Sequence, residues 1–252
     1  MRACVYLGPT LAAVDAAGAL EATWLPPAKQ GDVYRAVSLL RPRAIGIVDG
    51  YFRSVPSVWH KEILWAMHHG VHVFGAASMG ALRAAELAPF GMRGIGRIFE
   101  AFRDGALARC GDEPFEDDDE VAVVHGPAEL GYVAGSEAMV NIRCTLADAQ
   151  AAAVIDAATC LRLASIAKAM FFPERSYERL LEQARAVGLC VSQLASLEAW
   201  LPAGRVNQKR ADALAMLEAL REFLATDPAP AAAGFAFEHT TLWDRALAQM
   251  RT

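Results

Sequence analysis

The sequence predicts an α/β protein with a mostly parallel sheet flanked by helices, followed by a helical C-terminal region. Short apolar runs alternate with helical patterns up to about residue 145, as is typical of a parallel sheet covered by helices. From about Leu146 the apolar spacing is helical almost throughout. The 252 residues are 54% apolar and 21% charged, so the chain can bury a sizeable core.

The strands are expected at residues 3–7, 21–25, 44–48 and 71–75, with a later one at residues 121–124. The first ends at Gly8-Pro9 and the second at Pro26-Pro27, which break extended structure. Since helical patterns separate the strands, parallel pairing is expected, whereas the strand order cannot be read from the sequence.

Helices are expected at residues 32–40, from Ser54 or Ser57 to Gly70, at residues 78–87 and at residues 96–103. Thr10 can cap a short helix after the first strand, and Pro173 suits a helix N-terminus. Residues 227–234 form a Pro/Ala-rich linker before a last short helix. We therefore expect an α/β core domain over residues 1–145 and a helical region over residues 146–252.

Composition excludes several classes of function. A formal charge of −5 argues against a general nucleic-acid binder, which needs a basic face. The five cysteines are scattered without CxxC spacing, so neither a disulfide framework nor a metal site is expected. The N-terminus lacks a signal peptide's apolar run, and no apolar stretch is long enough to span a bilayer. We expect a cytoplasmic protein without cofactor or membrane association.

Ligands of open parallel sheets bind beyond the carboxyl ends of the strands, and three segments fall there: residues 8–10, 49–52 and 75–80. Ser78 is the most informative residue, because it lies on a strand-to-helix turn between the small residues Ala76 and Gly80, as a nucleophile elbow requires. A helix cap is the alternative role for this serine, and local pattern favours it.

The turn at Ser78 also suits an anion. The N–H groups of Met79, Gly80 and Ala81 would point at an anion or a developing oxyanion. One turn apart on the same helix, Arg83 and Glu86 can pair with each other, or Arg83 can reach an anion at the helix end.

Two further residues are candidates for the chemistry. His60, in the first turn of its helix, can act as a general base, although a surface role is commoner there. Asp49 ends a buried strand and can orient a base or bind a polar ligand, or simply bond its own backbone in a turn. The acidic run at residues 116–120 lacks EF-hand spacing, so a solvated loop is favoured over a cation site.

Three stretches closely resemble the core of the TfuA family: DGYF at residues 49–52, SVWHKEIL at 57–64 and GAASMGALRAAEL at 75–87. Further matching pieces are residues 5–10, 90–92, 119–123, 125–127 and 140–143. The resemblance covers roughly the first two thirds of the chain.

The resemblance implies that the protein is the partner of a YcaO enzyme in ribosomal peptide modification. YcaO enzymes use ATP to activate a backbone amide oxygen. With a TfuA partner, the incoming nucleophile is sulfide and the product is a thioamide. The resemblance also implies that this sulfide comes from a thiocarboxylated ubiquitin-like sulfur carrier, which would make the protein a hydrolase. Thr10, whose segment matches the family, is placed with the anion-binding residues.

Two alternatives remain from the sequence. The protein can be a non-catalytic adaptor that docks YcaO and positions the precursor peptide or the carrier. It can also be a small-molecule anion binder that uses the same edge of the sheet. Sulfide release in the absence of YcaO would separate the hydrolase from both.

Overall fold

The computed structural model describes residues 2–52, 55–107, 114–115 and 117–250. The chain forms two compact units, one of residues 1–103 with 210–252 and one of residues 104–209. The first unit is therefore built from two separate stretches of sequence. The division expected between residues 145 and 146 falls inside a helix, α6 (Met139–Ala151).

The first unit contains a five-stranded sheet in which every neighbouring pair is parallel, which confirms the predicted fold class. Its strands are β1 (Ala3–Tyr6), β2 (Thr23–Leu25), β3 (Ala44–Ile47), β4 (His72–Ala76) and β5 (Arg93–Ile95). Their order is β2-β1-β3-β4-β5. In the register, Tyr6 lies beside Ile47, and Ile47 beside Gly75, so β1, β3 and β4 end side by side.

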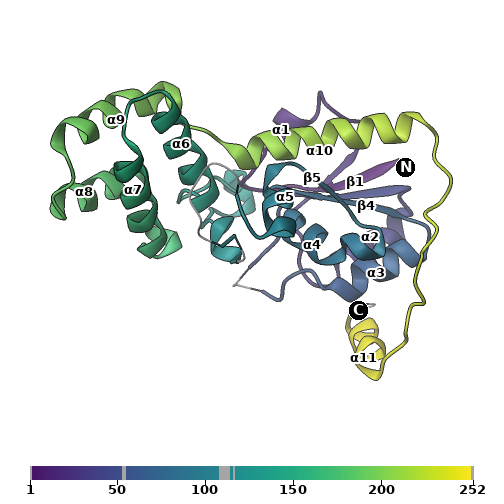
Figure 1. The fold of residues 1–252 in the computed structure, drawn as a ribbon. Helices are drawn as coiled ribbons and strands as arrows, with labels where there is room; N and C mark the ends of the chain where they lie inside the picture. The colour runs from purple at the N-terminus through teal and green to yellow at the C-terminus, as the bar shows by residue number, and fades with distance from the viewer. Residues whose placement is uncertain (1, 53–54, 108–113, 116, 251–252) are drawn as a thin grey trace. The chain divides into compact units, whose positions relative to one another are not determined.

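Seven helices and one 3₁₀ turn belong to the described part of this unit or run into it (Figure 1). They are α1 (Ala13–Ala16), α2 (Asp32–Leu40), α3 (His60–His68), α4 (Met79–Leu87), η1 (Ala88–Phe90), α5 (Arg97–Asp104), α10 (Gln208–Ala225) and α11 (Thr241–Met250). The main core joins the sheet to α10, because Val5 and Phe74 share one buried cluster with Met216 and Leu220.

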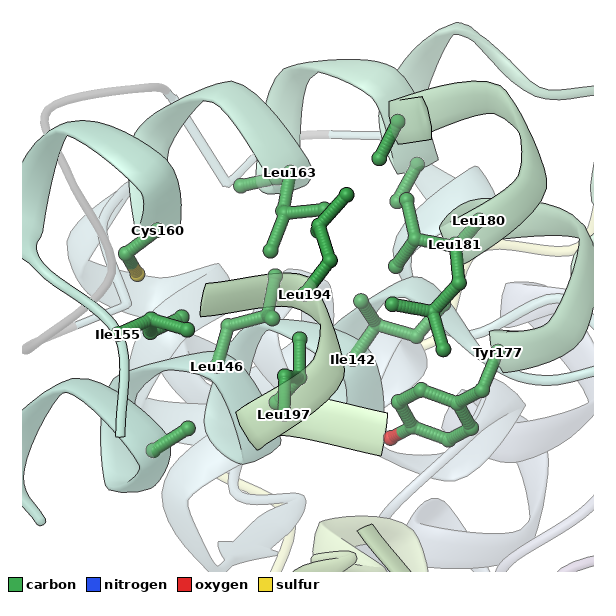
Figure 2. Close-up of a cluster of buried hydrophobic side chains, with 14 of the residues drawn as sticks. Ile142, Leu146, Ile155, Cys160, Leu163, Tyr177, Leu180, Leu181, Leu194 and Leu197 are labelled. Carbon is green, nitrogen blue, oxygen red and sulfur yellow. The ribbon is translucent and has the colours of Figure 1, made fainter. Parts of the chain in front are cut away.

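The second unit is helical in its described part. It contains η2 (Asp118–Glu120), η3 (Ala128–Leu130), α6, α7 (Ala157–Ala169), η4 (Phe172–Glu174), α8 (Tyr177–Ala186) and α9 (Val191–Gly204). Figure 2 shows its own apolar core, in which Ile142, Leu146, Leu163, Leu180 and Leu194 converge from α6, α7, α8 and α9.

Some local expectations were wrong. Thr10 caps no helix: α1 begins at Ala13 after Ala12, and the Thr10 hydroxyl bonds elsewhere. Helix α3 follows Trp59 and not Ser57, whose hydroxyl donates to the Tyr51 carbonyl; Ser54 lies outside the described residues.

The late strand expected at residues 121–124 is absent from the structure. Val121 and Ala122 are buried in the helical unit, and both donate their backbone N–H groups to the Asp118 carbonyl in a tight turn. The apolar residues Val121 and Ala122 are thus buried in a core although they do not form a strand. In contrast, β5 had escaped prediction because Arg93, Gly94 and Ile95 form no apolar run.

Candidate functional site

Thr10 and Asp49 meet at the carboxyl edge of the sheet, beyond the ends of β1 and β3. The Thr10 hydroxyl donates to Asp49 Oδ1 at 2.6 Å, and the Thr10 N–H donates to Oδ2 at 3.1 Å. Asp49 is only 1% exposed, so these two bonds compensate a carboxylate that has lost most of its water. The side chain of Asp49 is therefore held by a neighbouring strand end and not by its own turn.

Gly80 brings the start of α4 directly onto the end of β3. Its N–H donates to the Val48 carbonyl at 3.1 Å, and an added Cβ would lie 1.7 Å from the Ile47 carbonyl oxygen. Only glycine permits this approach. Gly50 is similarly tight, since a Cβ there would lie 2.7 Å from the Met79 side chain. The Asp49 loop and the Ser78 turn are thus packed against each other.

The turn before α4 is strained. Ala77 has a φ of +67°, and the Ser78 N–H donates to the Ala76 carbonyl at 2.8 Å, which makes a γ-turn. A residue with a side chain is uncommon at positive φ. Strain of this kind clusters at functional sites, where the surrounding structure holds it in place.

Ser78 stands at the cap position of α4 without capping it. Its hydroxyl makes no capping hydrogen bond, and the N–H of Ala81 bonds instead to the Ser78 carbonyl. Within the described part of the chain, no hydrogen bond to the Ser78 hydroxyl is seen, and the residue as a whole is 2% exposed. The helix-cap role that local pattern favoured is therefore not the one seen.

The three N–H groups expected to face an anion are not equally available. Those of Gly80 and Ala81 are bonded to Val48 and Ser78 carbonyls. Among the described residues, no hydrogen bond joins the N–H of Met79 to any acceptor. One backbone donor, together with the positive end of the α4 dipole, remains for an anion at this turn.

His60, Arg83 and Glu86 form a separate cluster. His60 Nε2 lies 2.7 Å from Glu86 Oε2, and the Arg83 guanidinium donates to the same oxygen at 2.7 Å. Arg83 also donates to the Val58 carbonyl. Burial alone would raise the pKa of Glu86, but the hydrogen bond from His60 and the charge of Arg83 outweigh it and lower that pKa.

This cluster lies away from the Ser78 turn. Glu86 follows Ser78 by eight residues, a rise of about 12 Å along a helix. In the described part of the chain, no hydrogen bond links His60 or Asp49 to Ser78. The structure therefore brings Thr10 to Asp49 and His60 to Glu86, but it does not assemble a serine–histidine–aspartate chain.

Glu62 is a buried acid that sequence reasoning missed. It is fully buried and accepts hydrogen bonds from the N–H groups of Gly31, Val33, Tyr34 and Trp59. Burial raises the pKa of the Glu62 carboxyl to about 7, against the lowering effect of these N–H groups. Its bond to the Trp59 N–H is the local one of a capping box, with Glu62 as the third residue of α3. The same carboxylate also closes the N-terminus of α2, and that contact between helices has no local signal.

The acidic run in the second unit is solvated only in part: Asp117 and Asp118 are exposed, as expected, but Asp119 and Glu120 are held in ion pairs. Glu120 is fully buried and forms a bidentate pair with Arg143, with both distances 2.9 Å. Lys168 bonds Asp119 and Glu120, and Arg175 bonds Asp119. Glu116 lies outside the described residues. No cluster of three metal-ligating side chains exists in the part that is described.

A family model described as "TfuA-like protein" matches residues 49–176, which is just over half of the sequence. The matched stretch includes Asp49, the Ser78 turn, the His60 cluster and the Glu120–Arg143 pair. No curated protein matches the chain. Among the described helices, none is long and apolar enough to cross a bilayer.

Proposed function

Because the chain belongs to the TfuA-like family, we propose that it works beside a YcaO enzyme in backbone thioamidation of a ribosomal peptide. Its task is to release sulfide from a thiocarboxylated, ubiquitin-like sulfur carrier and to supply it to YcaO. The family match over residues 49–176 is the observation that carries the proposal. The geometry at the carboxyl edge of the sheet supports the hydrolytic part.

The proposed reaction is hydrolysis of a thiocarboxylate. An oxygen nucleophile adds to the carbonyl carbon, the carbon–sulfur bond breaks, and the sulfur leaves as bisulfide. With water as the overall reactant, one thiocarboxylate and one water give one carboxylic acid and one bisulfide. Bisulfide is a good leaving group, so the protein has little more to do than bind the anion, orient the nucleophile and hold the developing oxyanion.

The Ser78 turn offers the groups for these tasks. The Met79 N–H and the start of α4 attract the negative end of the substrate. The unpartnered Ser78 hydroxyl lies beside them and is the proposed nucleophile. Its attack would form an acyl ester and release bisulfide, and a water would then hydrolyse the ester to the carboxylic acid and restore the serine. A preorganised donor of this kind is typically worth about 3 kcal/mol of transition-state stabilisation. Asp49, held by Thr10, can accept a hydrogen bond from a water at the same edge.

The assigned residues differ in how directly they serve this scheme. Glu86 already neutralises Arg83, so anion binding rests more on the helix end than on that guanidinium. His60 also bonds Glu86, so a proton transfer between His60 and Ser78 would require water or a movement of the histidine. Gly80 acts through its small size, because it allows the turn to reach the strand end.

The adaptor is the second candidate, and the place of His60 favours it. A serine that attacks needs a base, and no described base is bonded to Ser78. In the adaptor scheme the protein would only hold YcaO, the precursor peptide or the carrier. The Ser78 turn would then bind the carrier's C-terminus without chemistry.

Sulfide measurement with purified components separates the two candidates. The protein is incubated with carrier thiocarboxylate without YcaO, and unmodified carrier is the control. Sulfide release above the uncatalysed rate supports the hydrolase, and Ser78→Ala is expected to lower it by several orders of magnitude. A His60→Ala variant and the double variant then show whether the two side chains act as a unit.

Thioamide yield tests the partnership itself. YcaO, precursor peptide, ATP and carrier thiocarboxylate are combined with and without the protein at low free sulfide. A higher yield with the protein supports the partnership, whether or not sulfide release alone is seen. Equal yields would refute it, and a full yield with stably folded Ser78→Ala would refute the serine as nucleophile.

A further inference from the structure

A cavity of about 590 Å³ lies within the first unit, where β3 and β4 begin. It is thus at the opposite edge of the sheet from Asp49 and Ser78. Residues at the end of α2, the end of α3 and the segment Pro228–Pro230 line it. Cavities of 300 to about 1,000 Å³ are typical of sites for small organic ligands.

Two arginines line the cavity, and Arg41 is the one whose charge is not compensated by a described carboxylate. Arg41 follows α2 with a φ of +48°, and its N–H donates to the Val37 carbonyl, so its backbone is fixed. Within the described part of the chain, no carboxylate pairs with the Arg41 guanidinium. A guanidinium placed at the wall of a cavity is suited to a carboxylate or a phosphate.

Arg43 shows that this edge already holds a carboxylate. Its guanidinium bonds the Asp227 carboxylate and the Pro228 carbonyl. The hydrogen bond and the charge of Arg43 lower the pKa of Asp227. The pair of Arg43 and Asp227 shows that an arginine at this rim can bind a carboxylate. Arg41 remains available to bind the anionic group of a ligand.

Flat rings and apolar side chains form the remaining wall. The rings of Trp65 and His69 lie with centroids 4.1 Å apart, and His69 Nδ1 bonds the Trp65 carbonyl at 2.8 Å. His72 Nε2 bonds the Ala229 carbonyl at 2.8 Å. These bonds fix the two histidine rings in place, and Val37 and Val71 add apolar surface. Such a wall suits the planar, apolar body of a ligand.

We propose that this cavity binds an organic anion with a planar apolar body, its carboxylate or phosphate held by Arg41 beside Arg43. The inference does not depend on the proposed thiocarboxylate chemistry, which uses the other edge of the sheet. The two possible anionic groups, carboxylate and phosphate, are distinguished by the choice of probe.

Calorimetric titration of the full chain with two matched sets of probes tests the proposal. One set is indole-3-acetate, neutral indole-3-acetamide and acetate; the other is AMP, adenosine and inorganic phosphate. In at least one set, the ring-bearing anion is expected to bind at least tenfold more tightly than both its neutral and its ringless counterparts. The set in which this occurs identifies the anionic group.

Variants at Arg41 test whether the probes bind in this cavity. Arg41→Gly is expected to weaken binding at least tenfold without loss of fold, because glycine suits a φ of +48°. Arg41→Lys keeps the charge and is expected to lose less affinity than Arg41→Gly. Arg221→Gln is the control, since Arg221 pairs with Glu218 on α10 and does not line the cavity.

Three results would overturn the proposal. The first is that neither indole-3-acetate nor AMP binds the wild type at millimolar concentration. The second is that the neutral counterpart binds as tightly as the anion in both sets. The third is that a folded Arg41→Gly protein, checked by its melting temperature, binds within threefold of the wild type.

Discussion

His60 Nε2 lies 2.7 Å from Glu86 Oε2, in the last turn of the helix that Ser78 begins. The same carboxylate oxygen accepts a hydrogen bond from Arg83. His60 is therefore bonded to an ion pair at Glu86, which follows Ser78 by eight residues. Eight residues correspond to a rise of about 12 Å along a helix. Any chemistry at the Ser78 turn must therefore rely on the Ser78 hydroxyl, the Met79 N–H and water, and not on a direct bond to His60.

Replacing Ser78 should scarcely change stability, because its hydroxyl caps nothing. We expect Ser78→Ala to alter the free energy of unfolding by less than about 0.5 kcal/mol. Ser176→Ala is the matched control: Ser176 does cap α8, accepting from the Arg179 N–H, and its loss should cost about 1 kcal/mol. Urea denaturation of both variants checks this, and equal losses would contradict the uncapped geometry.

Gly80 should be irreplaceable for the fold of the first unit. An alanine Cβ would lie 1.7 Å from the Ile47 carbonyl oxygen, and backbone atoms cannot yield as a flexible side chain can. We expect Gly80→Ala to cost about 3 kcal/mol or more. Gly18→Ala, where a Cβ meets nothing within 4 Å, should stay within about 0.5 kcal/mol of wild type. Similar melting temperatures for the two variants would refute the close approach.

Glu62 should make the protein less stable as pH rises. Its pKa is about 7 in the folded protein against 4.5 for the ordinary side chain, so the folded state holds the extra proton between these values. The contribution to stability is complete below pH 4.5 and is lost as pH rises through 7. Its full size is about 3 kcal/mol, at 1.36 kcal/mol per pKa unit.

The measurement is urea denaturation at several pH values between 4.5 and 8 for wild type and Glu62→Gln. The difference between the two free energies of unfolding should change across this range, with wild type losing stability relative to the variant. Glu198→Gln serves as the control at an exposed acid paired with Arg185. A pH profile of wild type that runs parallel to that of Glu62→Gln would show that Glu62 does not titrate there.

The buried pair of Glu120 and Arg143 should be costly to break on one side only. We expect Glu120→Gln or Arg143→Met to destabilise the protein by about 3–5 kcal/mol, because either removes one partner of a buried, bidentate ion pair. The double variant should cost less than the sum of the two single changes. The exposed pair of Arg185 and Glu198, in the same unit, should show a coupling of under about 1 kcal/mol. Additive losses at Glu120 and Arg143 would contradict the coupling.

Much of the sheet could be predicted because its strands are short apolar runs. The predicted runs at residues 3–7, 44–48 and 71–75 correspond to β1, β3 and β4 within one residue at each end. Strand β5 has only three residues, including a glycine required by the Phe99 ring, so no apolar pattern revealed it. Conversely, the apolar residues after Glu120 fill a helical core, because burial alone does not specify a strand.

The part of the site that could be predicted follows from one rule: ligands of open parallel sheets bind beyond the carboxyl ends of the strands. That rule places Thr10, Asp49 and Ser78 near one edge, and the hydrogen bonds between Thr10 and Asp49 are consistent with it. The partners of individual side chains are tertiary contacts. Glu86 as the partner of His60, and Arg143 as the partner of Glu120, depend on how helices pack and leave no local signal.

The return of α10 to the first unit has a consequence for synthesis on the ribosome. The sheet is translated first, but Met216, Leu217 and Leu220, which bury Val5 and Phe74, emerge only after the entire second unit. One face of the nascent sheet thus stays uncovered while more than a hundred further residues are translated. The inserted helical unit, in contrast, contains all the residues of its own apolar core. Translation order therefore makes the inserted unit the first that can fold, and leaves the nascent sheet as the stretch most in need of a chaperone.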